Sequence, residues 1–144
     1  PLAHTAGDLR EFVGLFAQLA QLRLDLDVLA VDALEQRREL LIGVVIERVL
    51  EIEMEWAEAM SERYPKFRSH GRPLRSNEDG PGVTSVETYS RGELSTYSEK
   101  TLSLLLTWFS KALAEGNNLQ EKSDLLQVQL QGWKDLDAVE ASLA

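Results

Sequence analysis

The chain of 144 residues contains no cysteine. This absence excludes a disulfide framework, a thiolate metal site and a cysteine nucleophile, and it argues against redox chemistry by the protein's own side chains. A reducing compartment suits such a chain, and we predict a cytoplasmic location.

Basic residues are also scarce, with 15 lysines and arginines against 24 acidic residues and a formal net charge of -9. They form no long run. Such a surface repels phosphate groups, so we predict that neither nucleic acid nor an anionic membrane is a partner.

The sequence has no long hydrophobic run, since no apolar stretch approaches the roughly 20 residues that span a bilayer. The start, "PLAHTAGDLREF", lacks the pattern of a signal peptide. Because the chain begins with Pro and not Met, we expect a processed chain from which a leader could have been removed. The length and the 44% hydrophobic content predict one globular domain over residues 1–144.

Helical periodicity begins near the start of the chain, where apolar residues recur at three- and four-residue steps from Ala6 to about Leu29. These residues are Leu9, Phe12, Val13, Phe16, Leu19, Leu22, Leu26 and Leu29. The spacing predicts an amphipathic helix. The piece "LRLDLDV" alternates with period two, as a strand does, but no partner strand follows. A second helix is predicted from the capping box of Asp32 and Glu35 to Tyr64, before Pro65.

Two further main helices and a long loop complete the prediction. The segment 66–83 is rich in Gly, Pro and charged residues, which is loop composition. A third helix is expected from Ser85 to Glu115, with Gly116 at its end. A fourth opens at Asn118 and Glu121 and breaks at Gly132, before a short terminal helix. We therefore predict an all-α, single-domain bundle of about four main helices, with one long loop between helices two and three.

The second predicted helix has an apolar face and an acidic one. The acidic face contains Glu47, Glu51, Glu55, Glu58 and Glu62. A solvated surface explains these residues. The alternative, a carboxylate metal site, lacks support because neither His4 nor His70 stands three residues after a glutamate, and we predict no metal.

Glu53 lies within the apolar face of this helix, between Val49 and Trp56. An unpaired carboxylate there is costly or becomes protonated. It would therefore reach water at the edge of the face, pair with an arginine, or belong to a polar site.

The third predicted helix carries a polar group on its inward face. Its apolar face contains Leu94, Leu102, Leu105, Phe109 and Ala112, and the same rotation places Glu87, Arg91 and Ser98 in line with them. Tyr97 and Thr101 border this strip. Together with Glu53 these residues predict one buried network, which would be a structural clamp, a ligand pocket or an acid-base centre.

The loop contributes a cluster of basic residues in an otherwise acidic chain, namely Arg68, His70, Arg72 and Arg75. Their functional interpretation is an anionic ligand held by arginine side chains. The alternative is a solvated loop.

Two stretches, "EMEWAEAMSERYPKFRSHGRPL" and "TSVETYSRGELSTYSEKTL", resemble a mainly bacterial family known only as a domain of unknown function. The matching positions are Trp56, Tyr64, Pro65, Gly71, Arg72, Pro73, Thr84, Ser85, Glu87, Thr88, Tyr89, Arg91, Gly92, Glu93, Leu94, Thr96, Tyr97 and Ser98. The resemblance covers roughly Leu40 to Glu140 and implies a helical domain. It brings no substrate or catalytic assignment.

The leading hypothesis is a pocket between helices two and three that binds a small polar or anionic molecule, with acid-base chemistry as an extension. The predicted catalytic residues are Glu53 and Glu87, and the predicted ligand-binding residues are Arg72, Arg91, Tyr97, Ser98 and Tyr89. No cofactor is identified. The alternative is a protein interaction module in which the inward network is structural and the first helix forms a homodimer.

Overall fold

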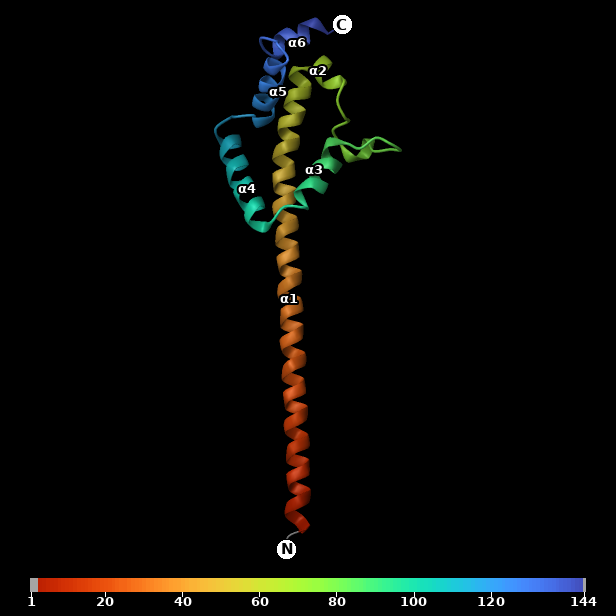
Figure 1. The fold of residues 1–144 in the computed structure, drawn as a ribbon, viewed down its shortest axis with the longest axis vertical. Helices are drawn as coiled ribbons and strands as arrows, with labels where there is room; N and C mark the ends of the chain where they lie inside the picture. Colours follow the sequence, from red (N-terminus) through yellow and green to blue (C-terminus); the bar gives the residue numbers. More distant parts are fainter. Residues whose placement is uncertain (1–2, 144) are drawn as a thin grey trace. The chain divides into compact units, whose positions relative to one another are not determined.

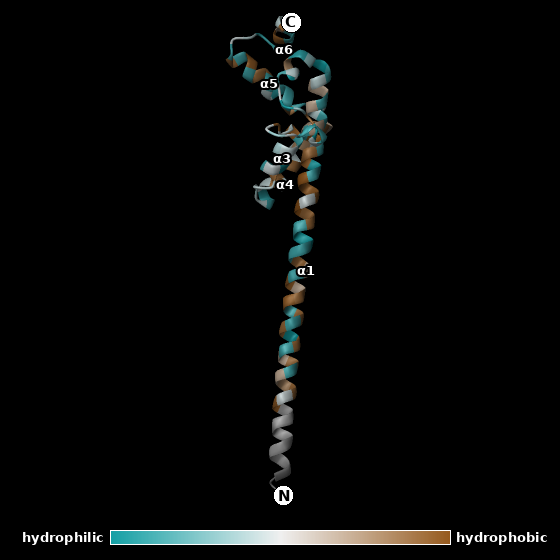
Figure 2. Cartoon of the chain, turned by 90° about the vertical axis from the view of Figure 1, so that its right-hand side faces the viewer, coloured by the Kyte–Doolittle hydropathy of each residue, from teal (hydrophilic) through white to brown (hydrophobic). Residues whose placement is uncertain are grey.

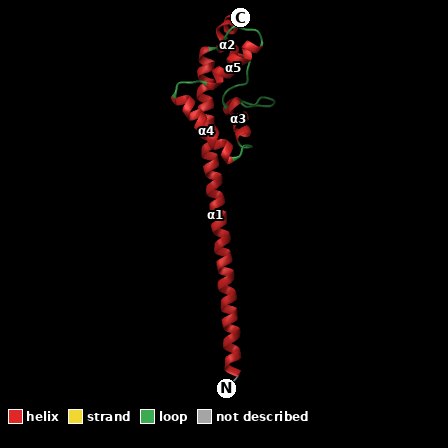
Figure 3. Ribbon diagram, turned by 60° about the vertical axis from the view of Figure 1, so that its left-hand side comes forward, coloured by secondary structure: helices red, strands yellow, loops and turns green. Residues whose placement is uncertain are grey.

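The computed structural model describes the backbone of residues 3–143 and the side chains of residues 13–143. Within that range the regular structure is helical and contains no strand, apart from an isolated bridge between Gly80 and Val83 (Figure 3). The predicted all-α class is confirmed. The side chains of His4, Leu9 and Phe12, on which part of the sequence prediction rests, lie outside the described residues.

The first helix, α1 (Ala3–Arg63), is continuous through the predicted boundary between Leu29 and Asp32. The prediction of two helices here is wrong. The surrounding "VLAVDALEQRRELL" contains no Gly or Pro and is rich in strong helix formers, so one aspartate does not interrupt it. Backbone contacts divide the chain into two units, residues 1–41 and residues 42–144, and α1 contributes to both. The single-domain expectation stays a prediction.

The remaining elements all belong to the second unit (Figure 1). They are α2 (Pro65–Ser69), the 3-10 helix η1 (Ser76–Glu78), α3 (Val86–Leu94), α4 (Glu99–Ala114), α5 (Leu119–Leu130) and α6 (Leu136–Ser142). The predicted end of the long helix at Pro65 is confirmed, because α1 stops at Arg63. The predicted loop 66–83 is partly helical, since α2 and η1 lie within or overlap it.

The single helix predicted from Ser85 to Glu115 is wrong, because α3 ends at Leu94 and α4 begins at Glu99. Hydroxyl groups bond the backbone at this break. Ser95 Oγ donates to Arg91 O at 2.7 Å, and the Ser98 side chain accepts from Thr101 N as the N-cap of α4. Serine and threonine compete in this way with helical hydrogen bonds.

The helix ends predicted at two glycines are confirmed. Gly116 follows α4 with φ of 70°, and Gly132 follows α5 with φ of 93°. Glycine adopts this left-handed conformation without the steric cost that a side chain brings.

The main hydrophobic core lies on the C-terminal part of α1, flanked by α3 and α4 (Figure 1). It contains Ile46, Val49, Leu50, Ile52, Met54, Trp56, Leu94, Leu102, Phe109 and Ala112. The rings of Trp56 and Phe109 lie 5.1 Å apart between centroids, which joins α1 to α4. The apolar face predicted for this part of the chain is therefore the one that is buried.

A second core closes the far end of this unit with Met60, Tyr64, Val128, Leu136 and Val139. Glu140 on α6 adds a polar tie, because it accepts hydrogen bonds from the backbone nitrogens of Lys66 and Phe67 at 2.9 and 2.8 Å. These contacts hold α2, α5 and α6 at the end of α1.

None of the helices in the described part of the chain is sufficiently long and apolar to traverse a lipid bilayer. The cytoplasmic location inferred from the sequence stays a prediction.

The cap at Ser98 yields a stability prediction. Ser98→Ala removes the acceptor for Thr101 N and should lower the free energy of unfolding by about 1 kcal/mol, whereas Ser98→Asp should retain most of it. Ser110→Ala, an exposed serine inside α4, is the matched control and should cost nothing. Denaturant unfolding of the three variants decides the point. Equal stability of Ser98→Ala and Ser110→Ala would contradict the cap.

Candidate functional site

Glu53 lies on the face of α1 that packs against α3 and α4, among the buried residues Val49 and Trp56. Its oxygen Oε2 is buried and has no hydrogen-bond partner among the described residues. A carboxylate oxygen in this position costs free energy unless a proton or a ligand donor satisfies it. The structure thus places Glu53 inward, as its spacing predicts.

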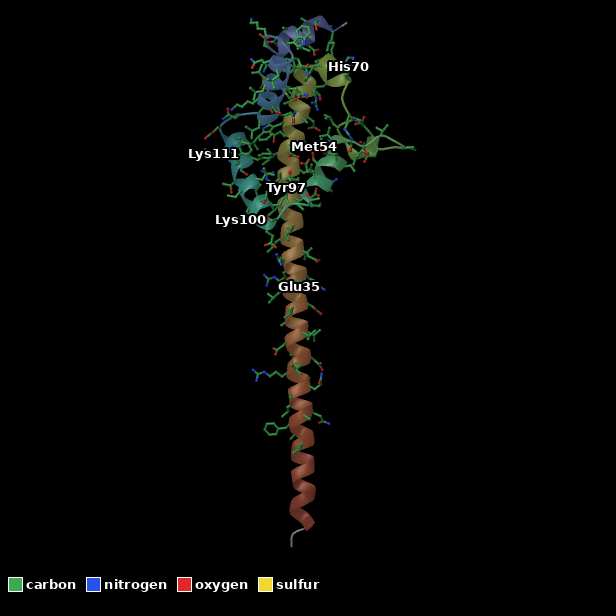
Figure 4. The ribbon with its side chains drawn as sticks, viewed as in Figure 1. Glu35, Met54, His70, Tyr97, Lys100 and Lys111 are labelled. Carbon is green, nitrogen blue, oxygen red and sulfur yellow. The ribbon has the colours of Figure 1, made fainter. Side chains whose placement is uncertain are left out.

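A cavity of about 180 Å³ lies beside Glu53. It is lined by Glu53, Ser90, Glu93, Leu94, Tyr97, Leu105 and Phe109. Three of these residues come from α3 and two from α4, and Tyr97 comes from the turn between those helices (Figure 4). The lining contains two carboxylates and no basic residue. Among the described residues, no group of three or more His, Asp or Glu could hold a metal ion.

The surroundings of Glu53 change its proton affinity. Burial raises the pKa of the Glu53 carboxyl above its ordinary value, and this effect exceeds the lowering by a hydrogen bond with Ser90. The nearby charge of Glu93 raises the pKa further. Glu53 therefore holds its proton to higher pH than an exposed glutamate.

Tyr97 and Glu93 form the polar rim of the cavity. The Tyr97 hydroxyl donates to Glu93 Oε1 at 2.9 Å. That hydrogen bond, followed by desolvation and the charges of Glu93 and Glu53, raises the pKa of the Tyr97 phenol. The phenol stays protonated near neutral pH and acts there as a hydrogen-bond donor.

Arg91 does not line the cavity. Its guanidinium donates to Glu47 from Nε at 2.8 Å and from Nη2 at 3.1 Å, and it also donates to Glu87 at 3.2 Å. The Arg91 hydrogen bond lowers the pKa of Glu47. Arg91 thus ties α3 to α1 on the outer side of the core through Glu47, and the predicted buried network of Arg91 and Glu87 with Glu53 is wrong.

Glu87 is likewise committed to structural contacts. It accepts from Ser76 N at 2.9 Å and from Arg91. The Ser76 backbone bond is the largest cause of the lowered pKa of Glu87, which opposes protonation at neutral pH. Glu87 joins η1 to α3 and lies outside the lining of the Glu53 cavity.

Arg72 of the loop lies over the ring of Tyr89 on α3. The Arg72 guanidinium stands 5.2 Å from the centre of the Tyr89 ring, and Arg72 Nη1 donates to Thr84 O at 3.3 Å. Two surface hollows, of about 540 and 620 Å³, are both lined by Gly71, Arg72 and Pro73. The arginine predicted to bind a ligand therefore belongs to these hollows and not to the cavity beside Glu53.

The structure brings Glu53 and Tyr97 together and leaves Ser98 at the helix cap. Sequence reasoning missed Ser90 and Glu93, which line the cavity. Glu93 and Tyr97 stand four residues apart in the predicted third helix, and this spacing is a signal for a hydrogen-bonded pair. The sequence prediction also assigned Glu47 to the solvated face and did not identify it as the partner of Arg91.

The chain belongs to the family described as Protein of unknown function (DUF4125), whose model matches residues 31–141. This result confirms the resemblance carried by the two quoted stretches. A search of curated proteins and a search of solved structures found no match.

Glu53→Gln tests the burial of this carboxyl through the pH dependence of stability. Because the pKa of Glu53 is raised in the folded chain, its protonation stabilises the fold at low pH, and that contribution is lost as the pH rises through the folded-state pKa. The variant cannot ionise there. Its free energy of unfolding, relative to wild type, should therefore increase between about pH 4 and about pH 8.

Glu55→Gln is the control, since it makes the same charge change at an exposed neighbour. Denaturant titrations at both pH values provide the comparison. If the two variants showed the same pH dependence, Glu53 would behave as a solvated carboxylate.

Proposed function

We propose that the cavity beside Glu53 binds a small molecule with a cationic or hydrogen-bond-donating head group and an apolar remainder. The observation that carries this proposal is the buried oxygen Oε2 of Glu53, which has no partner among the described residues and belongs to a residue lining the cavity. A ligand N–H or O–H would supply the missing donor.

The charge of the lining supports a cationic head group. Glu53 and Glu93 bring two carboxylates into one small space, and the charge of Glu93 raises the pKa of Glu53. An ammonium or amidinium group would neutralise that repulsion and form charge-assisted hydrogen bonds. The aromatic rings of Tyr97 and Phe109 also favour a cation.

The apolar residues of the lining support an apolar remainder. Leu94, Leu105 and Phe109 line the cavity beside the carboxylates. The volume of about 180 Å³ is below the range of about 300–1,000 Å³ that drug-sized ligands occupy. The proposed ligand is accordingly small, such as an amine with a short alkyl or aryl group.

The anionic ligand considered from the sequence has less support at this site. Arg91 is bonded to Glu47 and Glu87, and Arg72 lines the loop hollows. The cavity lining offers no cation to an anionic group.

Acid-base chemistry is an extension of the same proposal. A carboxyl with a raised pKa accepts or donates a proton nearer to neutral pH than an exposed one. In this version Glu53 moves the proton and the Tyr97 hydroxyl orients the bound molecule. Glu87, with its lowered pKa and two structural partners, is less suited to this role.

A screen of small ligands that are matched in size but opposite in charge tests the proposal. Small primary ammonium compounds, from methylammonium to benzylammonium, are compared with carboxylates of the same size by thermal shift and calorimetry. We expect binding by ammonium compounds that carry an apolar group. Glu53→Gln should weaken it by about tenfold or more, because a charge-assisted hydrogen bond is lost, and Glu55→Gln should not.

Two results would count against this site. Binding of the carboxylates in preference to the ammonium compounds would reverse the predicted charge. Equal binding to wild type and Glu53→Gln would place the ligand elsewhere on the protein.

A further inference from the structure

The part of α1 that belongs to the first unit exposes many apolar side chains. Between residues 13 and 41, thirteen Leu, Val and Phe side chains are each 53–70% exposed. They are Val13, Leu15, Phe16, Leu19, Leu22, Leu24, Leu26, Val28, Leu29, Val31, Leu34, Leu40 and Leu41. In Figure 2 the brown of hydrophobic residues recurs along this part of α1. Single exposed apolar residues are ordinary, but a contiguous surface of this kind marks an interaction site.

The leucines in this segment form one regular row. Leu15, Leu19, Leu22, Leu26 and Leu29 follow one another at alternating steps of four and three residues, and Ala33 continues the pattern. This is the spacing of the a and d positions of a coiled coil, with Leu19 and Leu26 at a. The row on the other side is weaker, because it holds one leucine among smaller residues: Val13, Ala17, Ala20, Leu24, Val28 and Val31.

We propose that the leucine row, residues 15–33, pairs with the same row of a second copy of the chain in a parallel, in-register coiled coil. This inference goes beyond the proposed function, because it concerns a different unit of the chain. A stable protein interface buries about 800 Å² per partner. The five leucines of the row are each more than half exposed and would form the apolar centre of such an interface.

Charges beside the row favour a second copy in parallel orientation. In a parallel pair, a g residue faces the e residue five positions later in the partner. Asp32 then faces Arg37 of the second copy, and Gln18 faces Arg23, so no like charges meet. An antiparallel pair places g residues opposite g residues, which brings together the like charges of Asp25, Asp32 and their equivalents.

The charge of the segment also argues against a membrane surface as the occupant. Residues 13–41 contain three arginines and five acidic residues. An anionic bilayer attracts basic helices and repels acidic ones. A second copy has no such penalty in the parallel register.

Sedimentation analysis of the full chain tests the pairing. Wild type should sediment as a dimer. Leu22→Glu places a charge within the row and should raise the dimer dissociation constant by about tenfold or more. Leu24→Glu is the matched control, because Leu24 is 59% exposed against 56% for Leu22 but lies outside the row. A monomeric wild type, or equal dissociation of the two variants, would overturn the proposal.

Disulfide trapping tests the orientation, since the chain has no other cysteine. Leu15→Cys lies near one end of the row, so two copies bring these thiols together only in the parallel, in-register arrangement. Mild oxidation should give a covalent dimer with Leu15→Cys and little with Leu24→Cys. A dimer by sedimentation that failed to crosslink through Leu15→Cys would rule out the parallel register.

Discussion

The burial of one face of α1, from Ile46 to Met60, is the constraint on which the rest of the second unit depends. A single helix cannot cover its own apolar face, so α3, α4 and α5 must pack against it. The position of α4 follows from the contact of Phe109 with Trp56. The candidate site arises where Glu53 interrupts this same face.

Three glutamates on α1 show how position decides the chemistry of a carboxylate. Glu47 and Glu58 lie at the edge of the core, and each accepts hydrogen bonds from an arginine, Arg91 or Arg75. Their charges are neutralised in contact with solvent, where such pairs add little stability but fix neighbouring segments. Glu53 points inward, has no arginine among the causes of its pKa shift, and retains a buried oxygen without a partner. The residues that fix the fold and the residue proposed to bind a ligand are therefore separate.

Much of this arrangement was predictable from local patterns. The apolar spacing around Glu53 identified it as an inward carboxylate, and Pro65, Gly116 and Gly132 marked helix ends that the structure confirms. These features depend on helical periodicity and on backbone conformation, which act over a few residues.

Other features depend on competition between alternative local structures, which a helical wheel does not represent. Asp32 can cap a helix only if the residues before it are not helical. The residues around Asp32 have high helix propensity, so the helix continues through this position. The hydroxyls of Ser95 and Ser98 bond the backbone where the predicted third helix is broken, so the helical wheel cannot be continued from Glu87 and Arg91 into α4. The choice of Glu47 as the partner of Arg91 depends on how α3 packs on α1, and the sequence contains no local signal for it.

The most direct test of the account is the pKa of the Glu53 side-chain carboxyl, measured by carbon NMR titration with Glu53→Gln used to assign the signal. We predict that the pKa lies above the ordinary value of 4.5 in the free protein and falls when a small ammonium compound is bound. A pKa at the ordinary value that does not respond to any ammonium compound would contradict it.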